Sequence, residues 1–151
     1  MNNEYKSYED VLEDTINEVL DEKIQKLKIV NNIGKYSIAY FSTLADNTNI
    51  VIKITTKRNS YPAEIWVYNE IARHGVPVPD LIFYTEKLKG IGLPCLIISQ
   101  ISGSSLASKN IPEEFERAIY GEIGRVFSKI HKVKLDSSFY GFGVFFKNTK
   151  D

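Results

Sequence analysis

The chain has 151 residues, of which 43% are hydrophobic and 25% are charged. This composition is typical of one globular domain of ordinary size, and it excludes a disordered, collagen-like or disulfide-scaffold protein. The 19 basic and 19 acidic residues cancel, so the overall charge gives no argument for a nucleic-acid partner or for an anionic membrane surface.

The N-terminal part of the sequence predicts one helix followed by three strands. Apolar residues recur at helical spacing among acidic ones, which predicts an amphipathic helix over residues 8–26. The pattern then changes to β-branched and aromatic residues, which predicts strands over 27–33, 37–44 and 50–56. Turn-forming residues such as those at 45–49 separate the strands. We therefore expect an antiparallel meander.

The second part predicts a helix, two strands and a long helix. The first helix covers residues 62–73, because a proline suits its first turn and Gly75 suits a stop just past its end. Strands follow over 81–86 and 94–101. After a loop rich in serine and glycine, a long helix begins near Pro112. Its predicted apolar face consists of Phe115, Ile119, Ile123, Val126, Phe127 and Ile130.

Cellular location is indicated by two weak features of the sequence. The single cysteine, Cys95, lies in an apolar run, so we expect a small buried thiol that is compatible with a reducing cytoplasm. The polar, acidic N-terminus does not resemble a signal peptide, and the apolar runs are too short to span a membrane. We therefore expect a cytoplasmic protein with neither a membrane nor a nucleic acid as partner.

Lys53 is the residue that most strongly indicates a chemical role. It lies in the centre of the apolar run Ile50–Ile54, where a lysine is costly unless its ammonium group reaches an anion. In a kinase-like lobe the anion is a nucleotide phosphate, and a glutamate on the next helix, here Glu64, orients the lysine. An edge-strand lysine that faces water is the alternative interpretation of the same pattern.

The order of the predicted elements gives the fold class. A lysine in the third strand and a glutamate in the following helix, with two further strands and a linker, is the order found in a protein-kinase small lobe. We therefore predict an α+β protein with a five-stranded, mainly antiparallel sheet and one packed helix. An N-terminal helix and a long C-terminal linker helix complete the predicted fold.

Three segments resemble the aminoglycoside phosphotransferase family of kinase-like enzymes. They are AEIWVYNEIARHGVPVPDLI at residues 63–82, LPCLIISQISGSSL at 93–106, and EIGRVFSKIHKV at 122–133, the last followed by YGFG. That family has a helix with an early glutamate that runs into Gly-Val-Pro-x-Pro, then an apolar strand with a hinge and Gly-x-x-Leu, then a helix that ends in Ile-His. The resemblance spans about residues 27–143, and it depends on the order and spacing of these segments together.

The resemblance implies a binding site for the phosphates of ATP or GTP. Lys53 would contact the α- and β-phosphates and would be held by Glu64, which stands eleven residues before Gly75 as the family's glutamate does. The turn that contains Gly34 and Ser37 would lie over the phosphates and donate main-chain N–H groups and a hydroxyl. Glu70, the competing choice for the glutamate, is interpreted as a solvated helix residue.

The resemblance also implies how the base would be bound. The hinge after the apolar strand would bind it through the Ser99 carbonyl and the Ile101 N–H. Ile98 would be the gatekeeper before the hinge, and Val51 would cover one face of the adenine.

The catalytic residues and metal ligands of the family find no match in this chain. An aspartate follows neither His74 nor His131 at the second position, so the His-x-Asp loop that serves phosphoryl transfer is not found. Both histidines are interpreted as helix-end residues. The resemblance thus implies an N-terminal helix over residues 1–26, a kinase-like nucleotide-binding lobe over 27–103, and a linker with the start of a missing C-terminal lobe over 104–151. Mg²⁺ is implied only for the full-length parent.

The predicted function is that of the nucleotide-binding lobe of an ATP- or GTP-dependent small-molecule O-phosphotransferase, inactive on its own. The acceptor in the parent would be an aminoglycoside or another small hydroxyl-bearing metabolite. The alternative is a stand-alone, pseudokinase-like binding module. The aromatic segment at residues 139–146 would then be its interface and a candidate surface for self-association.

Overall fold

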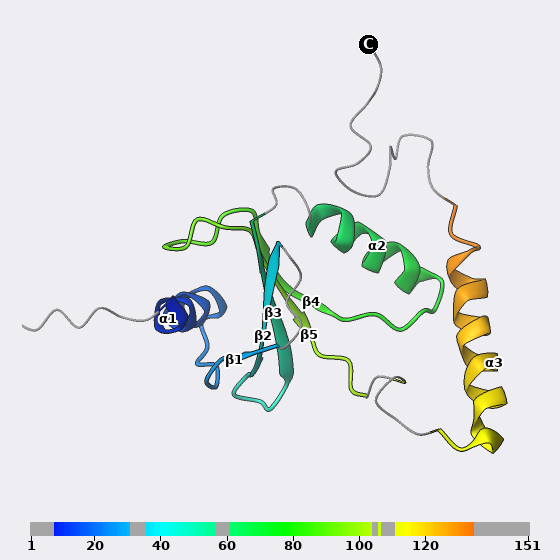
Figure 1. Cartoon of the computed structure of the whole chain (residues 1–151). Helices are drawn as coiled ribbons and strands as arrows, with labels where there is room; N and C mark the ends of the chain where they lie inside the picture. The colour runs from blue at the N-terminus through cyan, green and yellow to red at the C-terminus, as the bar shows by residue number, and fades with distance from the viewer. Residues whose placement is uncertain (1–7, 31–35, 57–60, 104–105, 107–110, 135–151) are drawn as a thin grey trace, which may run out of the picture. The chain divides into compact units, whose positions relative to one another are not determined.

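The computed structural model describes residues 8–30, 36–56, 61–103, 106 and 111–134. Gly34 and the aromatic segment at 139–146 lie outside these described residues. The elements follow the predicted order (Figure 1) and are α1 (Tyr8–Leu20), β1 (Lys28–Ile29), β2 (Ser37–Thr43), β3 (Asn49–Thr55), α2 (Tyr61–Arg73), β4 (Leu81–Thr85), β5 (Cys95–Ser99) and α3 (Glu113–Ile130).

The five strands form one sheet in the order β1-β2-β3-β5-β4, and every neighbouring pair is antiparallel. The α+β prediction with a five-stranded antiparallel sheet is therefore confirmed. β3 is the central strand, because it pairs along its length with β2 on one side and with β5 on the other. Of the strand predicted over 27–33, Lys28 and Ile29 form β1 and pair with β2, the Val30 N–H donates to the Ala39 carbonyl at 2.9 Å, and residues 31–33 lie outside the described residues.

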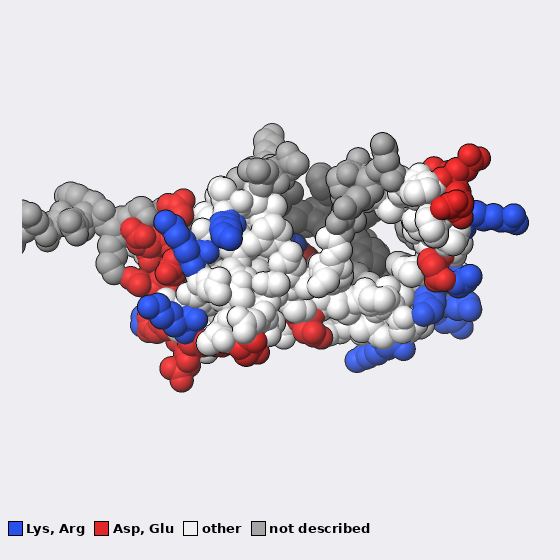
Figure 2. All heavy atoms as spheres, turned by 90° about the horizontal axis from the view of Figure 1, so that it is seen from below, with Lys and Arg blue, Asp and Glu red and all other residues white. Residues whose placement is uncertain are grey.

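The main core lies between α1 and one face of the sheet. Leu12 and Ile16 of α1 are fully buried, as are Ile52 of β3 and Ile97 of β5, which stand opposite each other in the register. Burying one such aliphatic side chain stabilises a fold by roughly 1.5–3 kcal/mol. Figure 1 shows α1 on this side of the sheet, and Figure 2 shows acidic side chains gathered on the same side of the sheet. The exposed acids of α1 are Glu9, Asp10, Asp14 and Glu18.

α1 ends earlier than the predicted helix over 8–26. The helix stops at Leu20, and Asp21 takes a left-handed conformation with φ of 50°. The following segment pairs with the sheet instead, because the Gln25 N–H donates to the Thr43 carbonyl at 2.9 Å. Apolar spacing did not reveal this stop, since the apolar residues Ile24 and Leu27 beyond it are buried like those of the helix.

The chain forms two compact units. The first comprises residues 1–62 and 79–100 and contains α1 and the sheet. The second comprises residues 63–78 and 101–151, and it contains α3 and all of α2 except its first two residues. Within the second unit, Gly75 ends the α2 segment in a left-handed conformation with φ of 68°, and the Lys129 ammonium group donates to its carbonyl at 2.8 Å.

The long helix α3 is formed as predicted, but its apolar face is largely uncovered by the described residues. Phe115 is 55% exposed and Phe127 is 54% exposed, and the helix has no buried residue. The helical spacing of these residues therefore predicted the helix correctly without revealing what covers it.

Cys95 on β5 provides a simple test of the core. The side chain is fully buried, as the sequence predicts, and burial raises the pKa of its thiol to about 12. Since the thiolate is the reactive form, we expect the native thiol to react with a disulfide reagent at pH 8 at least about 100-fold more slowly than the unfolded chain in urea. Equal labelling rates for the native and unfolded chains would contradict this burial.

Candidate functional site

The face of the sheet opposite the core carries four of the predicted site residues. Two adjacent rows of side chains cross this face from β2 through β3 to β5, one formed by Ala39, Lys53 and Leu96 and the other by Phe41, Val51 and Ile98. Because side chains alternate along a strand, the members of both rows point to the same side. Ser37 continues this face at the start of β2, opposite Thr55. The structure thus brings Ser37, Val51, Lys53 and Ile98 together on one surface.

Lys53 lies at the middle of the central strand and is half-buried. This position excludes the interpretation of Lys53 as an edge-strand residue. Its Nζ is 5.8 Å from the centroid of the Tyr61 ring, and Tyr61 is the first residue of α2. A cation over an aromatic face is attracted by about 0.5–2 kcal/mol. Tyr61 in turn makes an edge-to-face contact with Tyr84 of β4, with ring centroids 6.4 Å apart.

Tyr61 was not predicted as part of the site. Its contact with the Lys53 ammonium group depends on where α2 begins relative to the end of β3, and residues 57–60 between them lie outside the described part of the chain. An aromatic residue at the start of a helix is too common to signal such a contact by itself.

The row beside Lys53 is apolar and suits a flat, aromatic ligand. Val51 is half-buried and Ile98 is buried, and they are direct neighbours across β3 and β5. Phe41 stands on the other side of Val51 and is partly exposed. Sequence reasoning missed Phe41, although the alternation Ser37, Ala39, Phe41 along β2 carried the signal.

The predicted hinge begins at the end of β5. The Ser99 N–H donates to the Asp80 carbonyl at 2.9 Å, and the Ser99 hydroxyl accepts from the Asp80 N–H at 2.7 Å. The Gln100 N–H donates to the Asn49 carbonyl at 2.8 Å. These bonds fix residues 99–100 at the edge of the first unit. Ile101 is the first residue of the second unit in this segment, and its side chain is 56% exposed.

At the other end of β2, Ser37 lies near the predicted phosphate turn. Its hydroxyl contacts the Thr55 hydroxyl at 3.5 Å, and Thr55 donates to the Tyr36 carbonyl at 2.9 Å. These contacts fix the backbone where β2 leaves the turn. Gly34, the other residue predicted for this turn, lies outside the described residues.

Glu64 lies on α2 in the second unit and is half-buried. Its Oε1 accepts a hydrogen bond of 2.5 Å from the hydroxyl of Tyr68, one turn further along the helix. Burial raises the pKa of the Tyr68 hydroxyl well above its usual value, and the hydrogen bond and charge of Glu64 raise it further. Because Lys53 belongs to the first unit, its pairing with Glu64 stays a prediction.

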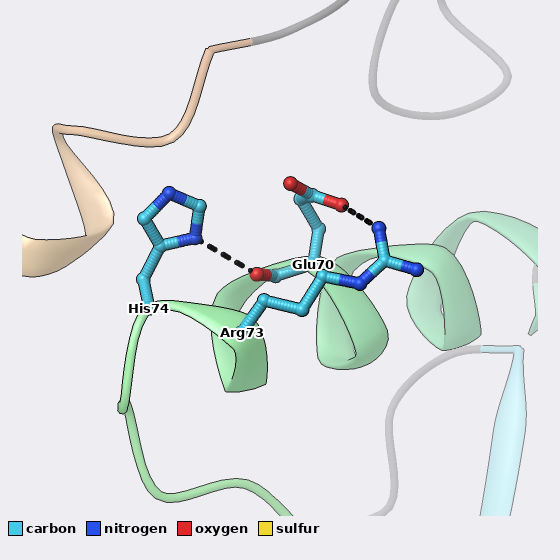
Figure 3. A network of polar contacts seen from close by, with 3 residues as sticks. All are labelled: Glu70, Arg73 and His74. Carbon is cyan, nitrogen blue, oxygen red and sulfur yellow. Dashed lines mark hydrogen bonds and ion pairs between the residues drawn. The ribbon is translucent and has the colours of Figure 1, made fainter.

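The end of α2 carries a second polar network, drawn in Figure 3. Arg73 pairs with the Glu70 carboxylate at 2.9 Å, and the His74 Nδ1 lies 3.0 Å from the Glu70 carbonyl. The Glu70 side chain is only 21% exposed, so it is less solvated than the sequence predicts. All three residues lie within one turn of the helix end. This network therefore stabilises the end of α2, in agreement with the interpretation of His74 as a helix-end residue.

The described residues offer no metal centre. Within residues 8–30, 36–56, 61–103, 106 and 111–134, no group of three or more His, Cys, Asp or Glu side chains is placed to hold a metal ion. His131 caps the C-terminal end of α3, and its main-chain N–H donates to the Phe127 carbonyl at 2.9 Å. Among the described helices, none has the length and apolar character needed to cross a bilayer.

Comparison with known proteins identifies the family. The model of the family described as "Phosphotransferase enzyme family" matches residues 34–144, which include β2 to β5 and the helices α2 and α3. The chain belongs to this family. No curated protein matches the chain significantly.

This member of the phosphotransferase family resembles several solved structures. The crystal structure of aminoglycoside phosphotransferase APH(4)-Ia matches with a TM-score of 0.66 at 17% identity, over 82% of this chain and 40% of that one. A streptomycin–ATP complex of APH(2")-IIa matches with a TM-score of 0.63 at 12% identity, over 89% of this chain and 44% of that one. A putative fructosamine-3-kinase from Thermobifida fusca YX-ER1 matches with a TM-score of 0.54 at 16% identity, over 79% of this chain and 38% of that one.

At these identities the structural similarity shows the fold alone. It confirms the kinase-like amino-terminal lobe that the order of elements predicts. The chain spans about two-fifths of the length of the structures that it matches.

Proposed function

We propose that this chain is the nucleotide-binding amino-terminal lobe of an ATP- or GTP-dependent small-molecule O-phosphotransferase. The observation that carries the proposal is the position of Lys53 on the central strand, beside the apolar pair Val51 and Ile98 on the same face. A half-buried ammonium group next to an apolar surface suits a ligand with a flat base at one end and phosphates at the other. Membership in the phosphotransferase family supports this interpretation.

The base would lie against Val51 and Ile98 and would hydrogen-bond to the hinge. An adenine or guanine there would use the Ser99 carbonyl as acceptor and the Ile101 N–H as donor. Stacking on aliphatic side chains excludes water from the base, so the two hinge hydrogen bonds would form in a less polar environment and would be stronger than in water.

The phosphates would extend from the base toward Lys53 and the turn that contains Gly34 and Ser37. The Lys53 ammonium group would neutralise charge on the α- and β-phosphates, and Glu64 would hold the lysine in place. Removing Lys53 from the Tyr61 ring would cost part of the cation–π attraction, and the closer, fully charged phosphate oxygens would offset that loss.

The acceptor and the metal would bind outside this lobe. Related structures were solved with ADP and hygromycin B and with streptomycin and ATP, which supports a hydroxyl-bearing acceptor such as an aminoglycoside for the parent protein. Mg²⁺ would supply positive charge to the phosphates when bound, and among the described residues no group of three or more His, Cys, Asp or Glu side chains is placed to hold it. We propose the boundaries 1–26 for the N-terminal helix, 27–103 for the nucleotide lobe and 104–151 for the linker and the start of the catalytic lobe.

The chain on its own is expected to bind nucleotide weakly and to transfer no phosphate. The reason is that no His-x-Asp motif provides a base for the acceptor hydroxyl. The measurement is transfer of labelled γ-phosphate from ATP or GTP to hygromycin B or streptomycin in the presence of Mg²⁺. Turnover by the purified 151-residue chain would contradict the assignment of catalysis to a further lobe.

A further inference from the structure

We propose that Tyr68 is a positioning residue that sets the Glu64 carboxylate for its interaction with Lys53. The inference rests on the proposed nucleotide site and extends it by one residue. It is carried by a contact within a single unit, the hydrogen bond from the Tyr68 hydroxyl to Glu64 Oε1.

The helical geometry places the two side chains together. Tyr68 follows Glu64 by four residues on α2, so both side chains lie on the same side of the helix. The oxygen–oxygen distance of 2.5 Å is that of a hydrogen bond to a charged acceptor. Both side chains are half-buried, so water competes with this bond less than it would on an open surface.

The Tyr68 hydroxyl can act only as a donor in this contact. A carboxylate accepts hydrogen bonds and does not donate them. Burial and the neighbouring Glu64 both raise the pKa of Tyr68, so the hydroxyl keeps its proton throughout the range in which a kinase would be assayed. Over that range the Tyr68 hydroxyl is therefore available as the donor to Glu64.

Glu64 can orient Lys53 best if its carboxylate is held in one conformation. A glutamate side chain has several rotatable bonds, and ordering it costs conformational entropy. The bond from Tyr68 restricts Glu64 before any nucleotide arrives, so less entropy is lost when Lys53 is oriented toward the phosphates. Glu70 lies on the same helix but is bonded to Arg73 instead, which makes it a suitable comparison.

The test is a cycle of variants in the full chain, with ATP as the probe. Trp66 is the single tryptophan and lies two residues from Glu64, so its fluorescence can report binding. We expect Tyr68→Phe to weaken ATP binding by roughly 3- to 10-fold, which is less than the loss for a direct hydrogen bond between a charged group and the nucleotide, because Tyr68 acts only through Glu64. Glu64→Gln should weaken it at least as much. Since glutamine offers Lys53 no charge, adding Tyr68→Phe to Glu64→Gln should have no further effect.

Two controls separate positioning from folding. Tyr120→Phe removes an exposed tyrosine hydroxyl on α3, and Glu70→Gln removes a carboxylate from the other end of α2. Both should leave ATP affinity unchanged. As a spectroscopic readout, the ¹³Cζ resonance of Tyr68, assigned through Tyr68→Phe, should shift in Glu64→Gln while that of Tyr120 does not.

The outcomes distinguish the positioning role of Tyr68 from the nucleotide site on which it rests. If Glu64→Gln weakens ATP binding and Tyr68→Phe does not, the positioning role of Tyr68 is overturned and the nucleotide site stands. Additive losses in the double variant would also overturn the positioning role, because the hydroxyl would then act independently of Glu64. If the unaltered chain binds no ATP at any concentration reached by the titration, the proposed function is overturned together with the inference.

Discussion

Lys53→Met is expected to remove nearly all affinity of the chain for ATP while leaving the fold intact. Methionine keeps an unbranched apolar stem in the central strand and lacks the ammonium group. Hydrogen bonds to a charged partner contribute about 1.5–3 kcal/mol, so losing the Lys53–phosphate contact should weaken binding by about 10- to 100-fold. In a parent enzyme that carries the catalytic lobe, phosphotransfer activity should fall by at least the same factor.

The fold should tolerate Lys53→Met because the substitution relieves a half-buried charge. Removing that charge also removes its desolvation cost, which offsets the lost contact with the Tyr61 ring. We therefore expect the free energy of unfolding in urea to change by less than about 1 kcal/mol.

A matched control is Lys89→Met, since Lys89 is an exposed lysine of the same unit that pairs with Glu18. This variant should bind ATP as the unaltered chain does. Unchanged affinity in Lys53→Met, or equal losses in both lysine variants, would refute the role of Lys53.

Ile52→Ala is expected to produce the largest loss of stability. Ile52 is fully buried beneath α1 and stands opposite the fully buried Ile97. Replacing a core isoleucine by alanine removes buried apolar surface and leaves a cavity, which costs about 2–5 kcal/mol. Since total stabilities of small domains are about 5–15 kcal/mol, the urea midpoint should fall markedly.

The control for Ile52→Ala is Ile101→Ala, because Ile101 is largely exposed. Its free energy of unfolding should change by less than about 0.5 kcal/mol. Ile52 and Lys53 are neighbours in the chain but point to opposite faces of the sheet. The folded fraction of Ile52→Ala should therefore bind ATP with unchanged affinity, and a loss of affinity per folded molecule would argue against a nucleotide site confined to the other face.

The strands that form the site were predictable to within one or two residues. β2, β3 and β5 are dense in β-branched and aromatic residues, and such runs have few alternatives to a strand. The shared face of Val51 and Lys53 also follows from sequence, because they are two residues apart on one strand. The place of Ile98 beside them does not, since it depends on the register between β3 and β5.

The features that sequence could not supply depend on contacts between distant segments. α1 was predicted to continue to residue 26, but Gln25 pairs with Thr43 instead. Tyr61 was missed because its contact with Lys53 joins β3 to the start of α2, and the sequence does not show how these two elements lie in space. Tyr68 is different, since a tyrosine four residues after a glutamate on a predicted helix was visible in the sequence. The resemblance to the family identified Glu64 as a site residue but did not identify Tyr68.

The most direct test of the nucleotide site is a titration with ATP of the chain carrying ¹³C-labelled Ile, Val and Leu methyl groups. If the face opposite α1 binds the base, the methyl resonances of Val51 and Ile98 shift with increasing ATP while those of Ile52 and Ile97 stay in place. Shifts confined to Ile52 and Ile97, or no shift of Val51 and Ile98 at saturating ATP, would contradict a nucleotide site on this face of the sheet.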